Sequence, residues 1–137
     1  MQTSEPILLV EDDTVDAMTV KRALKELKAM NDIVHVTNGE EALEYLRDEN
    51  NEKPCIILLD FNMPKMNGAE FLRIIKVDEE LRRIPVVVLT TSKNERDIIE
   101  SFDLSVAGYM IKPIDYKQFV ETIRTIEAYW KLSRVPS

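Results

Sequence analysis

Four of five short, largely apolar runs in this chain end beside a polar residue that can take part in chemistry. The runs cover residues 7–10, 33–37, 56–59, 86–89 and 109–111. The first is followed by Glu11 and Asp12, the third by Asp60, the fourth by Thr90 and the last by Lys112. Short apolar runs of this kind are typical of strands covered on both faces of a parallel sheet. Because parallel strands end along one edge of a sheet, the pattern predicts that these polar residues form one site.

The segments between the apolar runs have the spacing of amphipathic helices. After the first run, Asp13 or Thr14 can cap a helix, whose apolar residues repeat at helical intervals and are Ala17, Val20, Leu24 and Leu27. Further helices are predicted over residues 40–47, 69–77, from Asn94 or Ser92 to Leu104, and 116–132. Alternating strands and helices require right-handed crossovers, which place helices on both faces of the sheet. The sequence therefore predicts an α/β fold with a doubly wound, five-stranded parallel sheet.

Length and composition limit the kind of protein this can be. The 137 residues fit a single domain over residues 1–137, with 45% hydrophobic and 31% charged residues. A net charge of −7 argues against a nucleic-acid partner. We expect no membrane insertion, because no apolar run approaches the roughly 20 residues that span a bilayer. Cys55, the one cysteine, opens a strand, and with no secretory signal it predicts a buried, reduced thiol in the cytoplasm.

Asp60 ends a predicted buried strand just before an irregular stretch. A carboxylate in that position is unfavourable unless a cation meets it. Taken alone, Asp60 is also explained as a capping or turn aspartate. The functional interpretation is that its carboxylate accepts a phosphoryl group, since carboxylates can act as nucleophiles.

Glu11 and Asp12 follow the first strand, which usually lies beside the third in doubly wound sheets. Three carboxylates at one edge repel one another, so the site is stable mainly when it holds a cation. Hard oxygen ligands suit Mg²⁺, and the backbone carbonyl of Asn62 can add a further ligand. An isolated acidic pair, with Asp13 and Asp16 nearby, is better explained as a solvated turn. The convergence with Asp60 favours the metal site.

Thr90 and Lys112 end the fourth and fifth strands. The Thr90 hydroxyl can donate a hydrogen bond to a phosphoryl oxygen. However, a β-branched residue at a strand end often reflects only the preference of such residues for β-strands. A lysine that ends a buried strand needs an anionic partner, and Asp60 or its phosphate is the obvious one. The two residues predict an anion-binding side to the site.

Four stretches of the chain resemble the receiver domains of response regulators in two-component signalling. They are residues 8–13, 59–68, 88–92 and 108–113, and they follow the family's order over nearly the whole chain. The resemblance implies the flavodoxin-like strand order 2-1-3-4-5. It also implies Asp60 as phosphoacceptor, Thr90 and Lys112 as ligands of the phosphoryl group, and Tyr109 as a switch aromatic. The Mg²⁺ ligands would be Glu11, Asp12, Asp60 and the Asn62 carbonyl.

Residues 108–136, together with residues 83–92, also resemble single-domain response regulators that partner phytochrome-type histidine kinases. Such a protein would receive its phosphoryl group from a sensor histidine kinase. With nothing following Ser137, it would signal by noncovalent contact with an effector or phosphotransfer protein. The resemblance further implies a homodimer through the fourth helix, fifth strand and fifth helix, where apolar residues are plentiful: Ile98, Ile99, Phe102, Tyr109, Tyr129 and Trp130. The alternative is that all of these residues belong to the core.

Other functions remain as alternatives. A receiver-shaped scaffold could bind partners without phosphorylation, but it would not need the complete acidic set. A phosphatase of the haloacid-dehalogenase type needs its nucleophilic aspartate on the first strand, and a flavodoxin-like electron carrier would have its flavin phosphate repelled by residues 11–13. A histidine phosphotransfer protein needs an exposed helical histidine, whereas His35 lies in a predicted strand. We therefore expect a signalling phosphoacceptor and not an enzyme, apart from self-phosphorylation and slow self-dephosphorylation.

Overall fold

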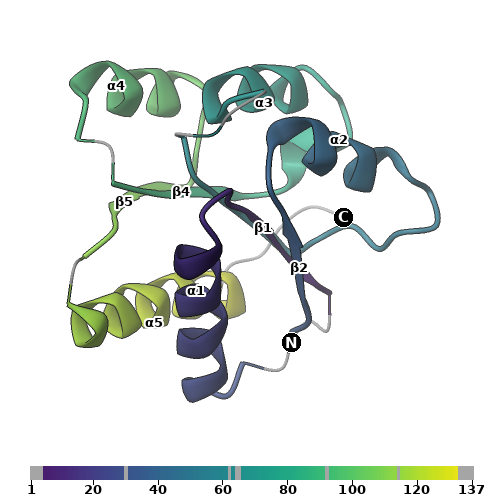
Figure 1. Ribbon diagram of the computed structural model, residues 1–137. Coiled ribbons are helices and arrows are strands. Elements are labelled where there is room, and N and C mark those ends of the chain that lie inside the picture. The colour runs from purple at the N-terminus through teal and green to yellow at the C-terminus, as the bar shows by residue number, and fades with distance from the viewer. Residues whose placement is uncertain are drawn as a thin grey trace.

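The computed structural model describes residues 5–29, 31–61, 63, 66–91, 93–113 and 115–132, with side chains up to residue 128. Strands and helices alternate along the chain (Figure 1). The strands are β1 (Ile7–Val10), β2 (Ile33–Val36), β3 (Ile56–Leu59), β4 (Val86–Thr90) and β5 (Gly108–Ile111). The helices are α1 (Thr14–Glu26), α2 (Gly39–Arg47), α3 (Gly68–Lys76), α4 (Glu95–Asp103) and α5 (Tyr116–Leu132), with a short 3-10 helix, η1, at Leu81–Arg83.

Within the described residues, the strands form one parallel sheet in the order β2-β1-β3-β4-β5. This confirms the predicted fold class and strand order. The last residue of β1, Val10, pairs with Leu59 at the end of β3, and Leu59 pairs with Val88 in β4. Because the strands end nearly in register, the residues that follow them come out at one edge.

Helices cover both faces of the sheet, as predicted, with α1 and α5 on one side and α2, α3 and α4 on the other (Figure 1). The apolar core beneath α2 and α3 includes Phe71, Leu72 and Ile75. The core beneath α1 and α5 includes Leu24 and Ile123. Strands β1 and β3 are buried along their whole length, which explains their continuous apolar sequences.

Side-chain caps set where several helices begin. Asp13 caps α1 and Asn94 caps α4, each one of two residues that the sequence allowed. Asn38 accepts a hydrogen bond from the amide of Glu41 and caps α2, so this helix begins at Gly39, one residue before the predicted start. Asn67 caps α3 through a reciprocal pair of hydrogen bonds with Glu70, and α3 therefore begins at Gly68 rather than Ala69.

The expected burial of Cys55 is refined by the structure. Cys55 is half-buried rather than buried, because it precedes β3 at the edge of the core, and burial raises the pKa of its thiol to about 11. No helix in the described part of the chain is long and apolar enough to cross a membrane.

Gly68 lets α3 approach the backbone that carries Asp60. A Cβ atom on Gly68 would lie 2.6 Å from the Phe61 ring, 2.8 Å from Phe61 Cα and 3.0 Å from the Asp60 carbonyl oxygen. We expect Gly68→Ala to lower the free energy of unfolding by about 2 kcal/mol, because backbone atoms must move to admit the methyl group. Urea denaturation measures this change.

Gly108→Ala is the matched control for this prediction. A Cβ atom on Gly108 would meet the Val87 side chain at an ordinary 4.0 Å. Its effect should stay within about 0.5 kcal/mol. Equal losses in the two variants would contradict the close-approach explanation.

Candidate functional site

The residues that follow the strands are held by hydrogen bonds that continue the backbone ladder of the sheet. The amide of Asp60 donates to the carbonyl of Val10 at 3.0 Å. The amide of Lys112 donates to the carbonyl of Thr90 at 2.8 Å. The backbone at each of these residues is therefore fixed by its neighbouring strand, so the side chains start from rigid positions at the predicted edge.

Glu11, Asp12 and Asp60 come together as predicted. Each offers a carboxylate oxygen, and these oxygens lie within 4.8 Å of one another. Glu11 and Asp60 are buried, whereas Asp12 is exposed to solvent. Two buried carboxylates and one exposed carboxylate leave an open side from which a hydrated divalent cation can enter.

The electrostatics of the acidic cluster favour a cation. Burial raises the pKa of the Glu11 carboxyl to about 8; a hydrogen bond from Lys112 opposes this rise and the neighbouring Asp60 adds to it. A divalent ion would relieve the repulsion and favour the ionised form. The donor set therefore fits a divalent ion.

Lys112 is the cationic residue of the site. Among the described residues, its ammonium contacts the carboxylates of three. Its Nζ donates to Glu11 Oε1, to Asp16 Oδ2 at 2.8 Å and to Asp60 Oδ2 at 3.5 Å. Burial lowers the pKa of Lys112, but the hydrogen bonds to Asp16 and Glu11 and the charge of Asp60 outweigh it and hold the pKa above its ordinary value. Lys112 therefore stays charged although its side chain is only 5% exposed.

The sequence predicted Asp60 as the partner of Lys112, and the structure adds Glu11 and Asp16. Asp16 had been assigned only to a solvated acidic turn. It lies in the first turn of α1, where its amide donates to Asp13 Oδ1 at 3.0 Å. Its position is the signal that could have found it. An acidic residue three positions after the cap lies in the first turn of the helix, close to the end of the strand that precedes the helix.

Thr90 and Tyr109 lie on neighbouring strands beside the cluster. Thr90 is completely buried at the end of β4. The Tyr109 ring is half-buried and meets the ring of Phe61 edge-on, with 6.1 Å between centroids and 77° between planes. Tyr109 thus contacts the residue directly after Asp60. Asn62, the predicted carbonyl ligand, lies outside the described residues.

His35 packs within β2, as its place in a predicted strand suggested. Its Nε2 lies 2.7 Å from the carbonyl oxygen of Glu11. A carbonyl only accepts hydrogen bonds, so this ring nitrogen carries the hydrogen. The contact ties the edge strand to the backbone of the acidic cluster.

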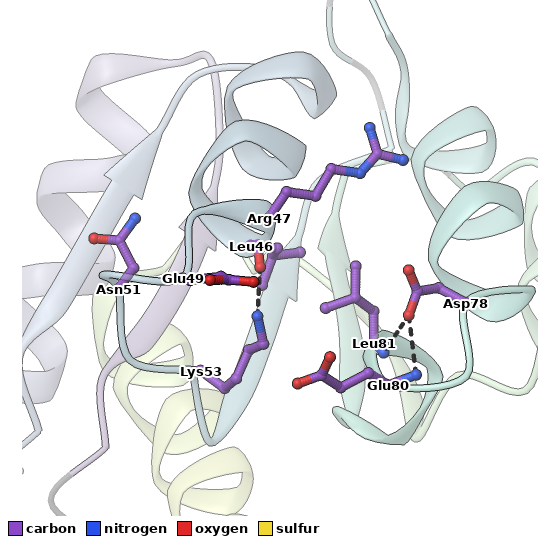
Figure 2. A pocket seen from close by; sticks show the side chains of 8 residues that line it. All are labelled: Leu46, Arg47, Glu49, Asn51, Lys53, Asp78, Glu80 and Leu81. Carbon is purple, nitrogen blue, oxygen red and sulfur yellow. Dashed lines mark hydrogen bonds between the residues drawn. The ribbon is translucent and has the colours of Figure 1, made fainter.

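A cleft of about 420 Å³ lies away from this site, where α2 and α3 lead back toward the starts of β3 and β4. Residues 46–53 form one wall and residues 78–81 the other (Figure 2). Lys53 Nζ donates to the Leu46 carbonyl at 2.5 Å, and the Asp78 carboxylate accepts the amides of Glu80 and Leu81 at 2.9 and 3.0 Å. These charged groups bond within their own walls, so the cleft shows no comparable convergence of reactive groups.

The sequence matches the profile of the response regulator receiver domain over residues 7–124. This chain belongs to that family. Receiver-domain response regulators are signalling proteins, and phosphorylation of an aspartate is the mechanism of the family. The chain is 41% identical over 128 residues to response regulator Rcp1 of Synechocystis, a match that covers 90% of this chain and 87% of the relative.

Solved receiver structures superpose closely on this fold. The phosphorylated cyanobacterial phytochrome response regulator RcpA has a TM-score of 0.92 and 41% identity, over 98% of this chain and all (100%) of that one. The Mn²⁺-bound form of Rcp1 has a TM-score of 0.89 and 38% identity, over 97% of this chain and 99% of that one. A related protein that holds a divalent ion supports the assignment of the acidic cluster as a divalent-ion site.

A divalent ion should stabilise the fold through the acidic cluster. At ten times its Kd, Mg²⁺ or Mn²⁺ is expected to add about 1.4 kcal/mol to the free energy of unfolding, because it binds the folded chain. Asp12→Asn should lose most of this gain. Thermal melts with and without the ion measure the effect.

Asp13→Asn is the matched control, since it removes the same charge from the next residue and keeps the capping oxygen. It should retain most of the stabilisation. Equal stabilisation of the Asp12→Asn variant and the wild type would rule out Asp12 as a ligand.

Proposed function

We propose that this protein is a response regulator that accepts a phosphoryl group on Asp60 from a sensor histidine kinase. The observation that carries the proposal is the meeting of a buried Asp60 carboxylate with the Lys112 ammonium and the Glu11–Asp12 pair at one sheet edge. Asp60 supplies a nucleophile, Lys112 a fixed positive charge, and the acidic pair a place for a metal ion. These are the parts that phosphoryl transfer to a carboxylate requires.

In the proposed reaction, an Asp60 carboxylate oxygen forms a bond to phosphorus as the phosphorus–nitrogen bond of the donor phosphohistidine breaks. The electron pair of the broken bond stays on the imidazole, and the product is an acyl phosphate. Lys112 Nζ is already 3.5 Å from Asp60 and can donate to the transferred oxygens. The buried Thr90 hydroxyl is the second proposed ligand of the phosphoryl group.

We assign Mg²⁺ as the metal, held by Glu11, Asp12, Asp60 and the Asn62 carbonyl. The support is an all-oxygen donor set with an exposed member, Asp12, which suits an ion that keeps several waters. When bound, Mg²⁺ would neutralise charge on the phosphoryl oxygens. The hydrogen bond from the Asp60 amide to the Val10 carbonyl orients the acceptor, and the burial of Asp60 limits the access of water to it.

The proposed switch couples Thr90 to Tyr109. A phosphoryl group adds about −1.5 to −2 charges beside Thr90 and Lys112. If Thr90 moves toward it, the half-buried Tyr109 ring can change its packing against Phe61. The surface of α4, β5 and α5 would then report the state of Asp60 by a shift in an existing equilibrium.

The partner is proposed to be a phytochrome-type histidine kinase, with an effector or phosphotransfer protein downstream. The support is similarity to RcpA, which is a cyanobacterial phytochrome response regulator. The net charge of −7 argues against nucleic acid as a partner. We also place the protein in the cytoplasm, since its one cysteine, Cys55, is a free thiol.

A homodimer through α4, β5 and α5 is proposed from the surface of α4. Ser101 is the buried residue of this nine-residue helix, whereas Ile99 is 56% and Phe102 55% exposed. Exposed apolar side chains side by side mark interaction surfaces. The side chains of Tyr129 and Trp130, which the prediction also included, lie outside the described part of the chain.

Incubation with acetyl phosphate and Mg²⁺ should add one phosphoryl group to the wild-type protein, as measured by intact-mass spectrometry. Asp60→Asn should take up none, because an amide oxygen is a poor nucleophile. Asp48→Asn, at an exposed residue after α2, is the matched control and should label like the wild type. Equal labelling of Asp60→Asn and the wild type would overturn the assignment.

Beryllofluoride, a phosphoryl mimic, should raise the dimer fraction measured by light scattering. Phe102→Glu should reduce dimer formation, whereas Val77→Glu, at a residue 82% exposed at the end of α3, should not. Thr90→Ala should remove the response to the mimic, because the coupling to Tyr109 is lost. A monomer under every condition would refute the dimer and leave phosphorylation of Asp60 standing.

A further inference from the structure

The ammonium of Lys112 lies closer to Asp16 than to the proposed phosphoacceptor. Its Nζ is 2.8 Å from Asp16 Oδ2, an ordinary hydrogen-bond length, and 3.5 Å from Asp60 Oδ2, the outer limit for such a bond. Lys112 thus already has a good partner outside the acidic cluster formed by Glu11, Asp12 and Asp60. A phosphoryl group on Asp60 must share this ammonium with Asp16.

The backbone of Asp16 is held independently of the groups that bind metal and phosphate. It lies in the first turn of α1, where its amide donates to Asp13 Oδ1. The amino end of a helix favours a negative charge, so this position suits a carboxylate apart from its contact with Lys112. Its side chain is 35% exposed, in contrast to the buried Glu11 and Asp60.

Two electrostatic effects follow, and both oppose phosphorylation. Asp16 keeps part of the hydrogen bonding of Lys112 away from the phosphoryl oxygens, and its own negative charge repels them. For a metal ion the signs reverse: Asp16 attracts the cation and offsets repulsion from Lys112. One carboxylate should therefore shift the affinities for metal and phosphoryl group in opposite directions.

We propose that Asp16 is a positioning residue that holds the Lys112 ammonium and competes for it with the phosphoryl group on Asp60. The inference rests on the proposed function and assigns a regulatory role within the same site. Asp16 favours the metal-bound, unphosphorylated state, and Lys112 shifts from Asp16 toward the phosphoryl oxygens when Asp60 is modified.

Calorimetric titration of wild type and Asp16→Asn tests the proposal. Beryllofluoride is titrated at saturating Mg²⁺, and Mg²⁺ is titrated alone. Asp16→Asn should bind beryllofluoride about threefold more tightly and Mg²⁺ about tenfold more weakly, the factors for one unit charge about 6 Å from a singly and a doubly charged ion in water. A purely structural role for Asp16 would weaken both, because damage to the site cannot improve binding of one ligand.

Two further variants make the test specific. Asp13→Asn removes the same charge from the cap of the same helix without touching Lys112, and should change both affinities less than Asp16→Asn does. Asp16→Glu keeps the charge and should remain close to wild type. Weaker or unchanged beryllofluoride binding by Asp16→Asn, or an equal effect of Asp13→Asn, overturns the inference. Failure of the wild type to bind beryllofluoride overturns the proposed function itself.

Discussion

The site depends on one buried charge, the ammonium of Lys112, placed among carboxylates. Taking a lysine and two carboxylates out of water is unfavourable unless they meet in good geometry. Here the ammonium contacts Glu11, Asp16 and Asp60, and these contacts outweigh the effect of its burial. A single positive charge does not neutralise the carboxylates around it. The remaining negative charge gives the site its affinity for a further cation, and the ammonium gives it an affinity for anionic oxygens.

The fold makes this arrangement possible because parallel strands end together. Backbone hydrogen bonds between neighbouring strands fix Asp60 against β1 and Lys112 against β4. The same rigidity connects the site to the rest of the molecule through short contacts: Phe61, directly after Asp60, packs against Tyr109 on β5. In the proposed switch, a charge change at Asp60 reaches the surface of α4 and β5 through this contact, without a large rearrangement of the sheet.

The fold and most of the site could be predicted because they depend on local patterns. The apolar runs at Ile7–Val10 and Ile56–Leu59 are continuous since both faces of these strands are buried, and the polar residues after them fall at a common edge. The strand order and the roles of individual residues came from resemblance to a family. Small errors remained at helix starts: α2 and α3 each begin one residue earlier than predicted, at Gly39 and Gly68.

The contacts of Lys112 could not be predicted in full because they join distant parts of the chain. Asp16 lies 96 residues from Lys112 in sequence, and although its place in the first turn of a helix puts it near the strand end, that local position does not identify the lysine as its partner. Only the packing of α1 against the sheet shows that its carboxylate turns inward to the lysine. Cys55 was also predicted to be buried, but it is half-buried because it lies just before β3, where the core meets solvent.

The most direct test of the central claim locates the phosphoryl group by borohydride reduction of protein phosphorylated with acetyl phosphate and Mg²⁺. Reduction converts an aspartyl phosphate to homoserine, and peptide mass spectrometry identifies the converted residue. The account predicts conversion at Asp60, with Glu11 and Asp12 intact because the metal ion engages them. Conversion at Asp12, or at a carboxylate outside this cluster, would contradict it.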